Sequence, residues 1–207
     1  MSCGQNQAMT TSPADKPVGL RERKKARTRA AIQDHALRLF TEQGYAATTV
    51  EQIAEAAEVS QSTFFRYFPT KEDTVLYDRL DPVLIEHFLN QPADVGPVAA
   101  IRAAVHEVFR GLDEEQAELE AARQRLVLSV PDLRAKLFEQ FTEGMRMLHD
   151  AILRRLGRER DDFAVRMWTG ALTGVVLAAY VTSIEEGGDF LEYIDRGLTQ
   201  FEQGLPL

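Results

Sequence analysis

Residues 49–71 read TVEQIAEAAEVSQSTFFRYFPTK, and this stretch decides the fold. Thr49 is followed three residues later by a glutamine, which is the spacing of a capping box and predicts a short helix to about Ala57. Ser60 is a favourable N-cap for a second short helix, which Pro69 ends. The stretch therefore predicts two short helices joined by a tight turn.

The two sides of the second short helix differ in chemistry. Phe64 and Phe68 lie one turn apart and are predicted to face the core. Arginine and glutamine suit bidentate hydrogen bonds to base edges, and an aromatic ring can contact a thymine methyl group. This pair of helices predicts a helix-turn-helix whose second helix enters the major groove. Core packing is the alternative interpretation for Phe65. The predicted outer face carries Gln61, Ser62, Phe65 and Arg66.

Helical hydrophobic spacing continues along the flanking sequence, and no alternating run predicts a strand. A long helix begins near Arg21 and ends at Gly44. Another runs from Thr70, with Asp73 in its first turn, to about Leu89, and a proline at position 82 is expected to kink or split it. The predicted fold class is all-α with about nine helices. The remaining segments are about 98–112, 114–129, 131–156, 161–185 and 189–203.

Charge is unevenly distributed along the chain. The net charge of −8 alone argues against a nucleic-acid-binding protein. Residues 21–71, however, carry nine Lys/Arg against six Asp/Glu, a balance of +3, and residues 1–20 are neutral, so the remainder carries −11. We expect a mildly basic DNA-binding head at residues 20–70 and an acidic regulatory body at residues 71–207.

The first 19 residues are polar, contain two prolines and lack the apolar stretch and cleavage site of a secretory signal. They are predicted to be a disordered tail. Cys3 is the only cysteine, so no internal disulfide or cysteine-based zinc site is expected. No apolar run is expected to approach the roughly 20 residues of a membrane helix. These features favour a cytoplasmic protein without a membrane partner, metal or cofactor.

Residues 22–76 resemble the DNA-binding signature of the TetR family of transcriptional regulators. The resemblance rests on TTVEQIA at 48–54, VS at 59–60, TFFRYF at 63–68 and PTKE at 69–72. Lys71 also begins a helix whose amide dipoles favour an anion. The resemblance implies that one set of side chains faces DNA: Gln61, Ser62, Thr63, Phe65 and Arg66. It implies that a second set holds phosphates: Thr49, Tyr67 and Lys71.

Two features of the head leave alternatives open. Glu58 lies in the turn where the family often has glycine. A non-glycine residue with a positive φ is strained by roughly 1 kcal/mol, so either the turn tolerates it or the helices are placed differently. The basic run Arg21–Arg29 is either a solvated helix start or a source of delocalised attraction to phosphates.

The body resembles the C-terminal, acyl-CoA-like ligand-binding domain of mycofactocin-type regulators. The resemblance rests on RQRL at 123–126, SVPDLRA at 129–135 and the small residues around 170–179. It implies an acyl-CoA-like or other long amphipathic effector. Core packing is the alternative for each aromatic residue, and a surface salt bridge with Glu118 or Glu120 is the alternative for the arginines. The acyl part would lie among Phe109, Phe138, Phe141, Met145 and Trp168, and anionic groups near Arg123 or Arg125.

The sequence also favours a homodimer. Gly170, Gly174 and Ala178 form a small-residue stripe that another helix could approach, either from a partner or from the same chain. The last helix has an apolar side that a second subunit could cover: Leu191, Ile194, Leu198 and Phe201. With one helix-turn-helix per chain, we expect a dimeric repressor on a palindromic operator, released by a small effector.

Two rival functions make different demands on the sequence. An enzyme is disfavoured because the sequence has no nucleophile elbow, phosphate loop, dinucleotide fingerprint or paired-histidine metal motif. A helical scaffold or architectural DNA protein would share the head but would need no internal cavity, so a fully packed body would favour it.

Overall fold

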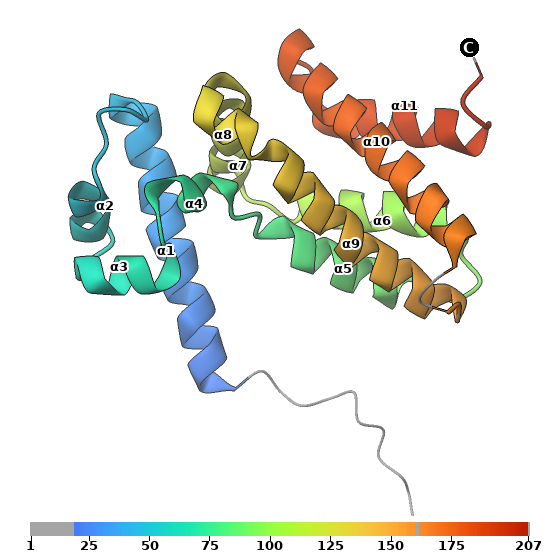
Figure 1. Cartoon of the computed structure of the whole chain (residues 1–207), viewed down its shortest axis with the longest axis horizontal. Helices are drawn as coiled ribbons and strands as arrows, with labels where there is room; N and C mark the ends of the chain where they lie inside the picture. The colour runs from blue at the N-terminus through green and yellow to red at the C-terminus, as the bar shows by residue number, and fades with distance from the viewer. Residues whose placement is uncertain (1–18, 160–161, 207) are drawn as a thin grey trace, which may run out of the picture.

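The computed structural model describes residues 19–159 and 162–206, which form eleven α-helices and no strand (Figure 1). The predicted all-α fold class is confirmed. Of the predicted tail, residues 1–18 lie outside the described residues, and Gly19 directly precedes the first helix. The helices are α1 (Leu20–Gln43), α2 (Val50–Ala56), α3 (Gln61–Tyr67), α4 (Lys71–Leu76), α5 (Leu80–Asn90), α6 (Pro97–Arg110), α7 (Glu114–Ser129), α8 (Pro131–Ala135), α9 (Leu137–Leu156), α10 (Phe163–Glu186) and α11 (Phe190–Glu202).

The described residues contain two more helices than the nine predicted, because two predicted helices are each divided. The helix expected from residue 70 to 89 is α4 and α5, separated by residues 77–79. Pro82, which was expected to divide it, lies in the first turn of α5, where a missing N–H is tolerated. The helix expected over 131–156 is α8 and α9, with Lys136 between them.

Side-chain contacts account for the break after α4. The amide of the buried Gln33 on α1 donates to the carbonyl oxygens of Thr74 at 3.0 Å and Tyr77 at 2.7 Å, which fixes the end of α4 against α1. The carboxylate of Asp78 then accepts a hydrogen bond from the backbone N–H of Leu80 at 2.8 Å and starts α5. The chain therefore turns between the two helices without a glycine or proline.

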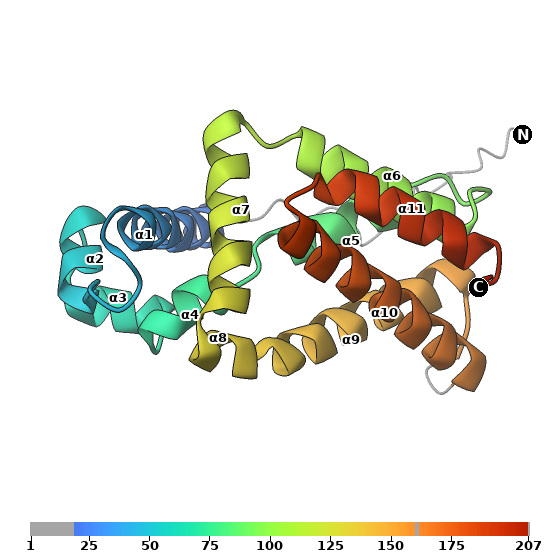
Figure 2. The same cartoon turned by 90° about the horizontal axis from the view of Figure 1, so that it is seen from above.

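Helices α1–α4 form the head and share one apolar core. That core continues into the body, because Leu119 and Val127 of α7 and Leu133 of α8 belong to it. Figure 2 shows α7 standing between the head and the remaining helices. The predicted domain boundary at residue 70 stays a prediction. The largest fully buried side chains of the head are Ile32, Leu37, Ile53, Phe64 and Phe68.

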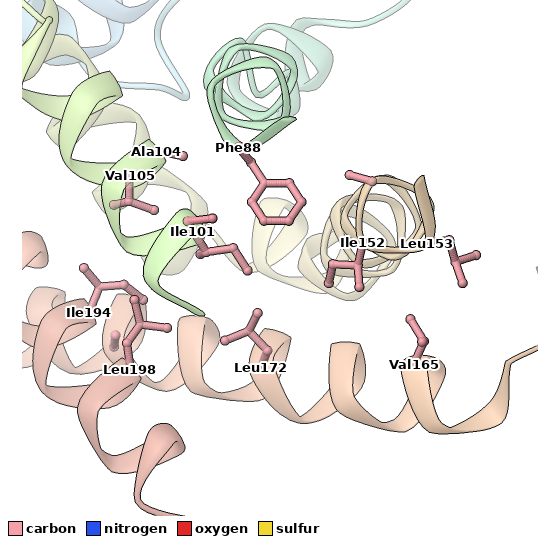
Figure 3. Packing of buried hydrophobic residues seen from close by; sticks show 13 residues of the cluster. Phe88, Ile101, Ala104, Val105, Ile152, Leu153, Val165, Leu172, Ile194 and Leu198 are labelled. Atoms are coloured by element: carbon pink, nitrogen blue, oxygen red, sulfur yellow. The ribbon is translucent and has the colours of Figure 1, made fainter. Parts of the chain in front are cut away.

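The core of the body is assembled from five helices. Phe88 of α5 points toward Ile101 of α6 and Ile152 of α9, and the α10 and α11 side chains Leu172 and Ile194 close the cluster (Figure 3). All five are buried. The apolar side of the last helix, which a second subunit was expected to cover, therefore packs largely inside its own chain.

Helix α10 is apolar yet largely exposed. Its 24 residues include an 18-residue window of mean hydropathy 1.5, of which 22% is buried, so length and composition alone would allow a membrane span. The expectation that no apolar run approaches that length is wrong, because residues 167–184 contain no charge. A Cβ at Gly170 or Gly174 would meet no described atom within 4 Å. No described helix of this chain therefore covers the exposed α10 stripe, which consists of Ala164, Met167, Ala171, Gly174 and Ala178.

Candidate functional site

The helix-turn-helix is built by local hydrogen bonds. The hydroxyl of Thr49 accepts from the backbone N–H of Gln52 at 3.3 Å, and the Gln52 amide oxygen accepts from the Thr49 N–H at 2.9 Å, so the predicted capping box is present. Ser60 caps α3 by accepting from the backbone N–H of Thr63 at 3.1 Å. Between the helices, Glu58 has a φ of 53°. The turn thus adopts the left-handed conformation with glutamate in place.

We expect Glu58→Gly to stabilise the protein by roughly 0.5–1 kcal/mol, because glycine adopts a positive φ without the steric cost of a Cβ. Urea unfolding measures the change. Glu55→Gly is the matched control, since it removes the same charge inside α2 and should destabilise the protein by about 1 kcal/mol. Equal losses in both variants would contradict the assignment of strain to the turn.

Helix α3 separates a buried face from an exposed one. Phe64 and Phe68 are buried, whereas the Phe65 side chain is 48% exposed and touches Phe64 edge-on at 5.5 Å between ring centroids. Core packing therefore does not describe Phe65. The guanidinium of Arg66 lies over the Tyr67 ring at 5.5 Å and within 3.5 Å of the Thr63 hydroxyl. Gln61, Ser62, Phe65 and Arg66 are all exposed on one surface, which we call the reading face.

Lys71 has internal partners. Its ammonium donates to the carbonyl oxygens of Tyr45 at 2.8 Å and Thr48 at 3.0 Å, and it lies 4.3 Å from the centroid of the Tyr45 ring. The side chain thus fixes the loop between α1 and α2, directly before the Thr49 cap. One of its three N–H donors remains for a phosphate. Its predicted role as a phosphate contact stays a prediction.

The basic run on α1 divides into two parts. Arg21, Arg23 and Arg27 are exposed. Arg29 instead lies among the rings of Tyr67, Phe68 and Tyr77, with the Tyr77 centroid at 4.9 Å, and its buried Nε has no hydrogen-bond partner among the described residues. Arg29 therefore stabilises the packing of α1 on α3 by cation–π contact.

A cavity of about 200 Å³ lies within the body. Its wall is mainly apolar, and its polar end lies at the junction of α4, α5 and α7. The apolar wall includes Leu84, Ile85, Ile101, Val105, Phe109, Phe141, Met145, Leu148, Val176 and Ile194. The polar residues along the wall are Asp78, Asp81, Glu120, Arg123, Gln124, Gln140, Thr173 and Tyr180.

The structure brings together four of the seven residues predicted to bind an effector: Phe109, Arg123, Phe141 and Met145 line this cavity. Arg125 is exposed and borders a separate pocket beside α10 and α11. Phe138 is 81% exposed, and Trp168 packs edge-on against Phe201 at 5.3 Å between ring centroids. Neither side chain lines the cavity.

Arg123 is buried and neutralised by carboxylates. Its guanidinium donates to Asp78 at 2.6 Å, to both carboxylate oxygens of Glu120 at 2.7 and 2.9 Å, and to the backbone carbonyl of Val75 at 3.3 Å. The salt bridge with Glu120 was anticipated from the sequence, but at the surface; here both side chains are about 5% exposed. Four of the five guanidinium N–H donors are used within the chain.

Sequence reasoning missed Asp78 and Asp81, two of the three acidic residues at this end of the cavity. Asp81 is the most perturbed of them: desolvation by burial, followed by the nearby charge of Asp78, raises the pKa of its carboxyl to about 7, although Arg123 opposes the shift. Asp78 lies two residues before α5 and accepts from the N–H of its first residue, and an acidic residue is common near the start of a helix. That cap signal could have identified the break after α4 and placed Asp78 there.

Two family models match the chain. One, described as the MftR C-terminal domain, matches residues 95–206, and the other, described as bacterial regulatory proteins of the tetR family, matches residues 32–76. The first covers the body from residue 95 onward, which includes most but not all of the cavity lining, and the second covers the helix-turn-helix.

Several known regulators are similar to this chain. TcmR, an HTH-type transcriptional regulator of Streptomyces glaucescens, is 35% identical over 78% of this chain and 75% of its own length. MftR of Mycobacterium tuberculosis, whose name links it to mycofactocin biosynthesis, is 26% identical over 92% of this chain and 100% of its own. The crystal structure of Thermus thermophilus FadR with lauroyl-CoA superposes with a TM-score of 0.53 at 26% identity, covering 86% of this chain and 95% of that one.

These matches set the enzyme interpretation aside, because the relatives are transcriptional regulators. They also agree with the two-part geometry, in which an exposed reading face and an internal cavity lie in one chain. The chain belongs to the TetR family of bacterial transcriptional regulators, with a helix-turn-helix DNA-binding domain followed by a ligand-binding domain.

Proposed function

We propose that this chain is a cytoplasmic repressor that binds a palindromic operator as a homodimer and is released by a small amphipathic effector. One observation carries the proposal: Arg123 lines the cavity and also bonds to the Val75 carbonyl and the Asp78 carboxylate, at the end of the helix that leaves the head. A ligand that disturbs this end of the cavity would therefore act directly on the connection to the reading face. Coupling of this kind requires different affinities for the two states, typically worth about 1–3 kcal/mol.

The cavity argues against a scaffold without a ligand, because such a protein was expected to have a fully packed body. An acyl-CoA effector is supported by one comparison, the FadR structure with lauroyl-CoA. The first test is selection of genomic fragments that the purified protein binds, followed by challenge of the bound operator with acyl-CoAs, fatty acids and hydrophobic amines. If no compound binds or changes operator affinity, the effector-responsive function is contradicted.

Arg66 is proposed to read a base edge. We expect Arg66→Ala to weaken binding to the true operator by about 1–3 kcal/mol and to relax the preference at one base pair per half-site, with little change on scrambled DNA. Binding isotherms on operator and scrambled duplexes measure both effects. If the variant loses equal affinity for both duplexes, Arg66 holds a phosphate and does not read a base.

Lys71 is proposed to support phosphate binding. Lys71→Ala should weaken operator and scrambled DNA alike and reduce the salt slope by about one unit for a lost phosphate contact. Because the ammonium also holds the Tyr45 and Thr48 carbonyls, we expect the thermal midpoint to fall as well. Isotherms at several salt concentrations separate these effects: a lower thermal midpoint with an unchanged salt slope would leave Lys71 a purely structural role.

The α10 stripe is proposed as the dimer interface, because it is apolar, exposed and rich in small residues that allow close helix approach. A dimer would place two reading faces about 34–36 Å apart, one helical turn of DNA. We expect light scattering at micromolar concentration to give a dimer for the natural chain and a monomer for Ala171→Glu. Ala117→Glu, on the exposed side of α7, is the control and should remain dimeric. A monomeric natural chain would contradict the proposal.

A further inference from the structure

The charges that line the cavity are unequal in number. Three carboxylates, those of Asp78, Asp81 and Glu120, face a single cation, Arg123. No other Lys, Arg, His, Asp or Glu lines the cavity within the part of the chain that the structure describes, and Tyr180 is the one further titratable side chain. The apolar cavity therefore has an acidic end with more negative than positive charge.

Arg123 has little capacity left for an anionic ligand. Its guanidinium already holds Asp78 and both oxygens of Glu120. An incoming carboxylate or phosphate would find one unused N–H donor, and a bidentate contact would displace Asp78 or Glu120 and leave a buried carboxylate without its counter-ion, which is strongly unfavourable. The anion-binding role expected for Arg123 from sequence resemblance is therefore difficult to realise in this geometry.

Among the three carboxylates at this end of the cavity, that of Asp81 is the one not bonded to Arg123. Its backbone N–H donates to Asp78 at 3.3 Å, whereas no hydrogen bond or ion pair of its carboxyl group is found among the described residues. The Oδ2 atom lies next to α9, 3.4 Å from the position that a Cβ of Gly144 would take. The carboxyl group thus stands on the cavity wall with its acceptor atoms available.

The size of the cavity limits the occupant. Its volume of about 200 Å³ is below the 300–1,000 Å³ that is usual for ligand pockets. A compact apolar body fits this space with little rearrangement, whereas the nucleotide portion of an acyl-CoA would have to lie elsewhere. The wall beyond the acidic end is aliphatic and aromatic, so it suits a hydrocarbon chain or a small ring system.

We infer that the effector is an amine: a compact apolar molecule whose ammonium group donates hydrogen bonds to Asp81 and balances the excess negative charge of the cavity end. This inference rests on the proposed effector-responsive function and names the chemical class of the effector. An ammonium beside the carboxylate forms a charge-assisted hydrogen bond, and the partial burial of this end of the cavity strengthens the attraction between the two charges.

The test compares probes that differ only in their polar group. Decylamine, decan-1-ol and decanoate, and a second series of 1-naphthylmethylamine, 1-naphthalenemethanol and 1-naphthoate, are titrated by calorimetry into the full chain at pH 7.5, below micelle-forming concentrations. In at least one series we expect the amine to bind about tenfold more tightly than the alcohol, the size of one charge-assisted hydrogen bond, and more tightly still than the carboxylate. Asp81→Asn should abolish this preference, and Asp132→Asn, at an exposed position on α8, should retain it.

The pH dependence provides a second readout. The groups facing Asp81 are Asp78, Glu120, Arg123 and Tyr180. Since the ionised carboxylate is the form that binds an ammonium and its pKa is raised to about 7, amine affinity should increase about tenfold from pH 6 to pH 8 in the natural chain. In Asp81→Asn the amine affinity should not depend on pH over this range, except for any change that the affinity for the uncharged alcohol also shows.

Three results would overturn the inference: binding of a carboxylate or lauroyl-CoA at least as tightly as the amine, an amine preference that survives in Asp81→Asn, or no amine binding in either series. The operator-binding assay distinguishes failure of the amine assignment from failure of the proposed function. If an anionic compound releases the operator, the effector-responsive function stands and the amine assignment is wrong. If no compound of any charge alters operator binding, the proposed function itself fails.

Discussion

Arg123→Met is expected to lower the free energy of unfolding by about 3–5 kcal/mol, because it leaves Asp78 and Glu120 without the cation that neutralises them. Methionine preserves most of the side-chain length, so the loss comes mainly from charge and hydrogen bonding. Urea unfolding at pH 7 and a fixed protein concentration measures the effect, since association would otherwise shift the midpoint.

The neighbouring arginine supplies a matched control for this variant. Arg125 lies on the same helix but is exposed, so Arg125→Met should change stability by less than about 0.5 kcal/mol. The double variant Arg123→Met/Glu120→Gln should regain part of the loss, because one uncompensated carboxylate is removed. Equal, small effects of the two arginine substitutions would contradict a structural role for the buried ion pairs.

Asp81→Asn is expected to stabilise the ligand-free protein at pH 8 but not at pH 4. The pKa of this carboxyl is raised from 3.8 to about 7 by burial and by Asp78. A raised pKa favours folding while the group is protonated, and this contribution is lost as pH rises from about 4 through 7. The asparagine side chain is neutral throughout, so the variant avoids the loss. The full shift corresponds to about 4 kcal/mol, which is an upper limit for a partly exposed side chain.

Thermal midpoints at several pH values between 4 and 8 provide the measurement. The difference in thermal midpoint between Asp81→Asn and the natural chain should grow as pH rises through this window and level off near pH 8. Asp132→Asn, which replaces an exposed carboxylate on α8, should show no such growth. A constant difference across the window would mean that Asp81 titrates at its ordinary pKa in the folded protein.

The sequence predicted the head well because its signals are local. The Thr49 capping box, the Ser60 cap and the end of α3 at Phe68, just before Pro69, each depend on residues a few positions apart. The buried positions of Phe64 and Phe68 follow from helical periodicity alone. The internal use of Lys71 could not be predicted in this way, because its partners are backbone carbonyls more than twenty residues away.

The cavity was predicted only in part because its geometry depends on distant contacts. Phe141 and Phe138 lie one turn apart, yet the first lines the cavity and the second is exposed. The packing of α9 against the other helices decides between them. Arg123 lines the cavity, but the sequence does not reveal its pairing with Asp78, 45 positions away, which neutralises the positive charge that Arg123 was expected to offer to a ligand.

Two of the last carbonyls of α4 accept hydrogen bonds from other helices. Among the carbonyls left open where a helix stops, that of Thr74 accepts from Gln33 of α1 and that of Val75 accepts from Arg123 of α7. One cap is thus supplied by the head and the other by the body. A fragment ending at Leu76 would lose the second, and its last turn would fray even if the rest of the head stayed folded. In this protein the hydrogen bonds that complete the final turn of the DNA-binding unit therefore include one from the ligand-binding unit.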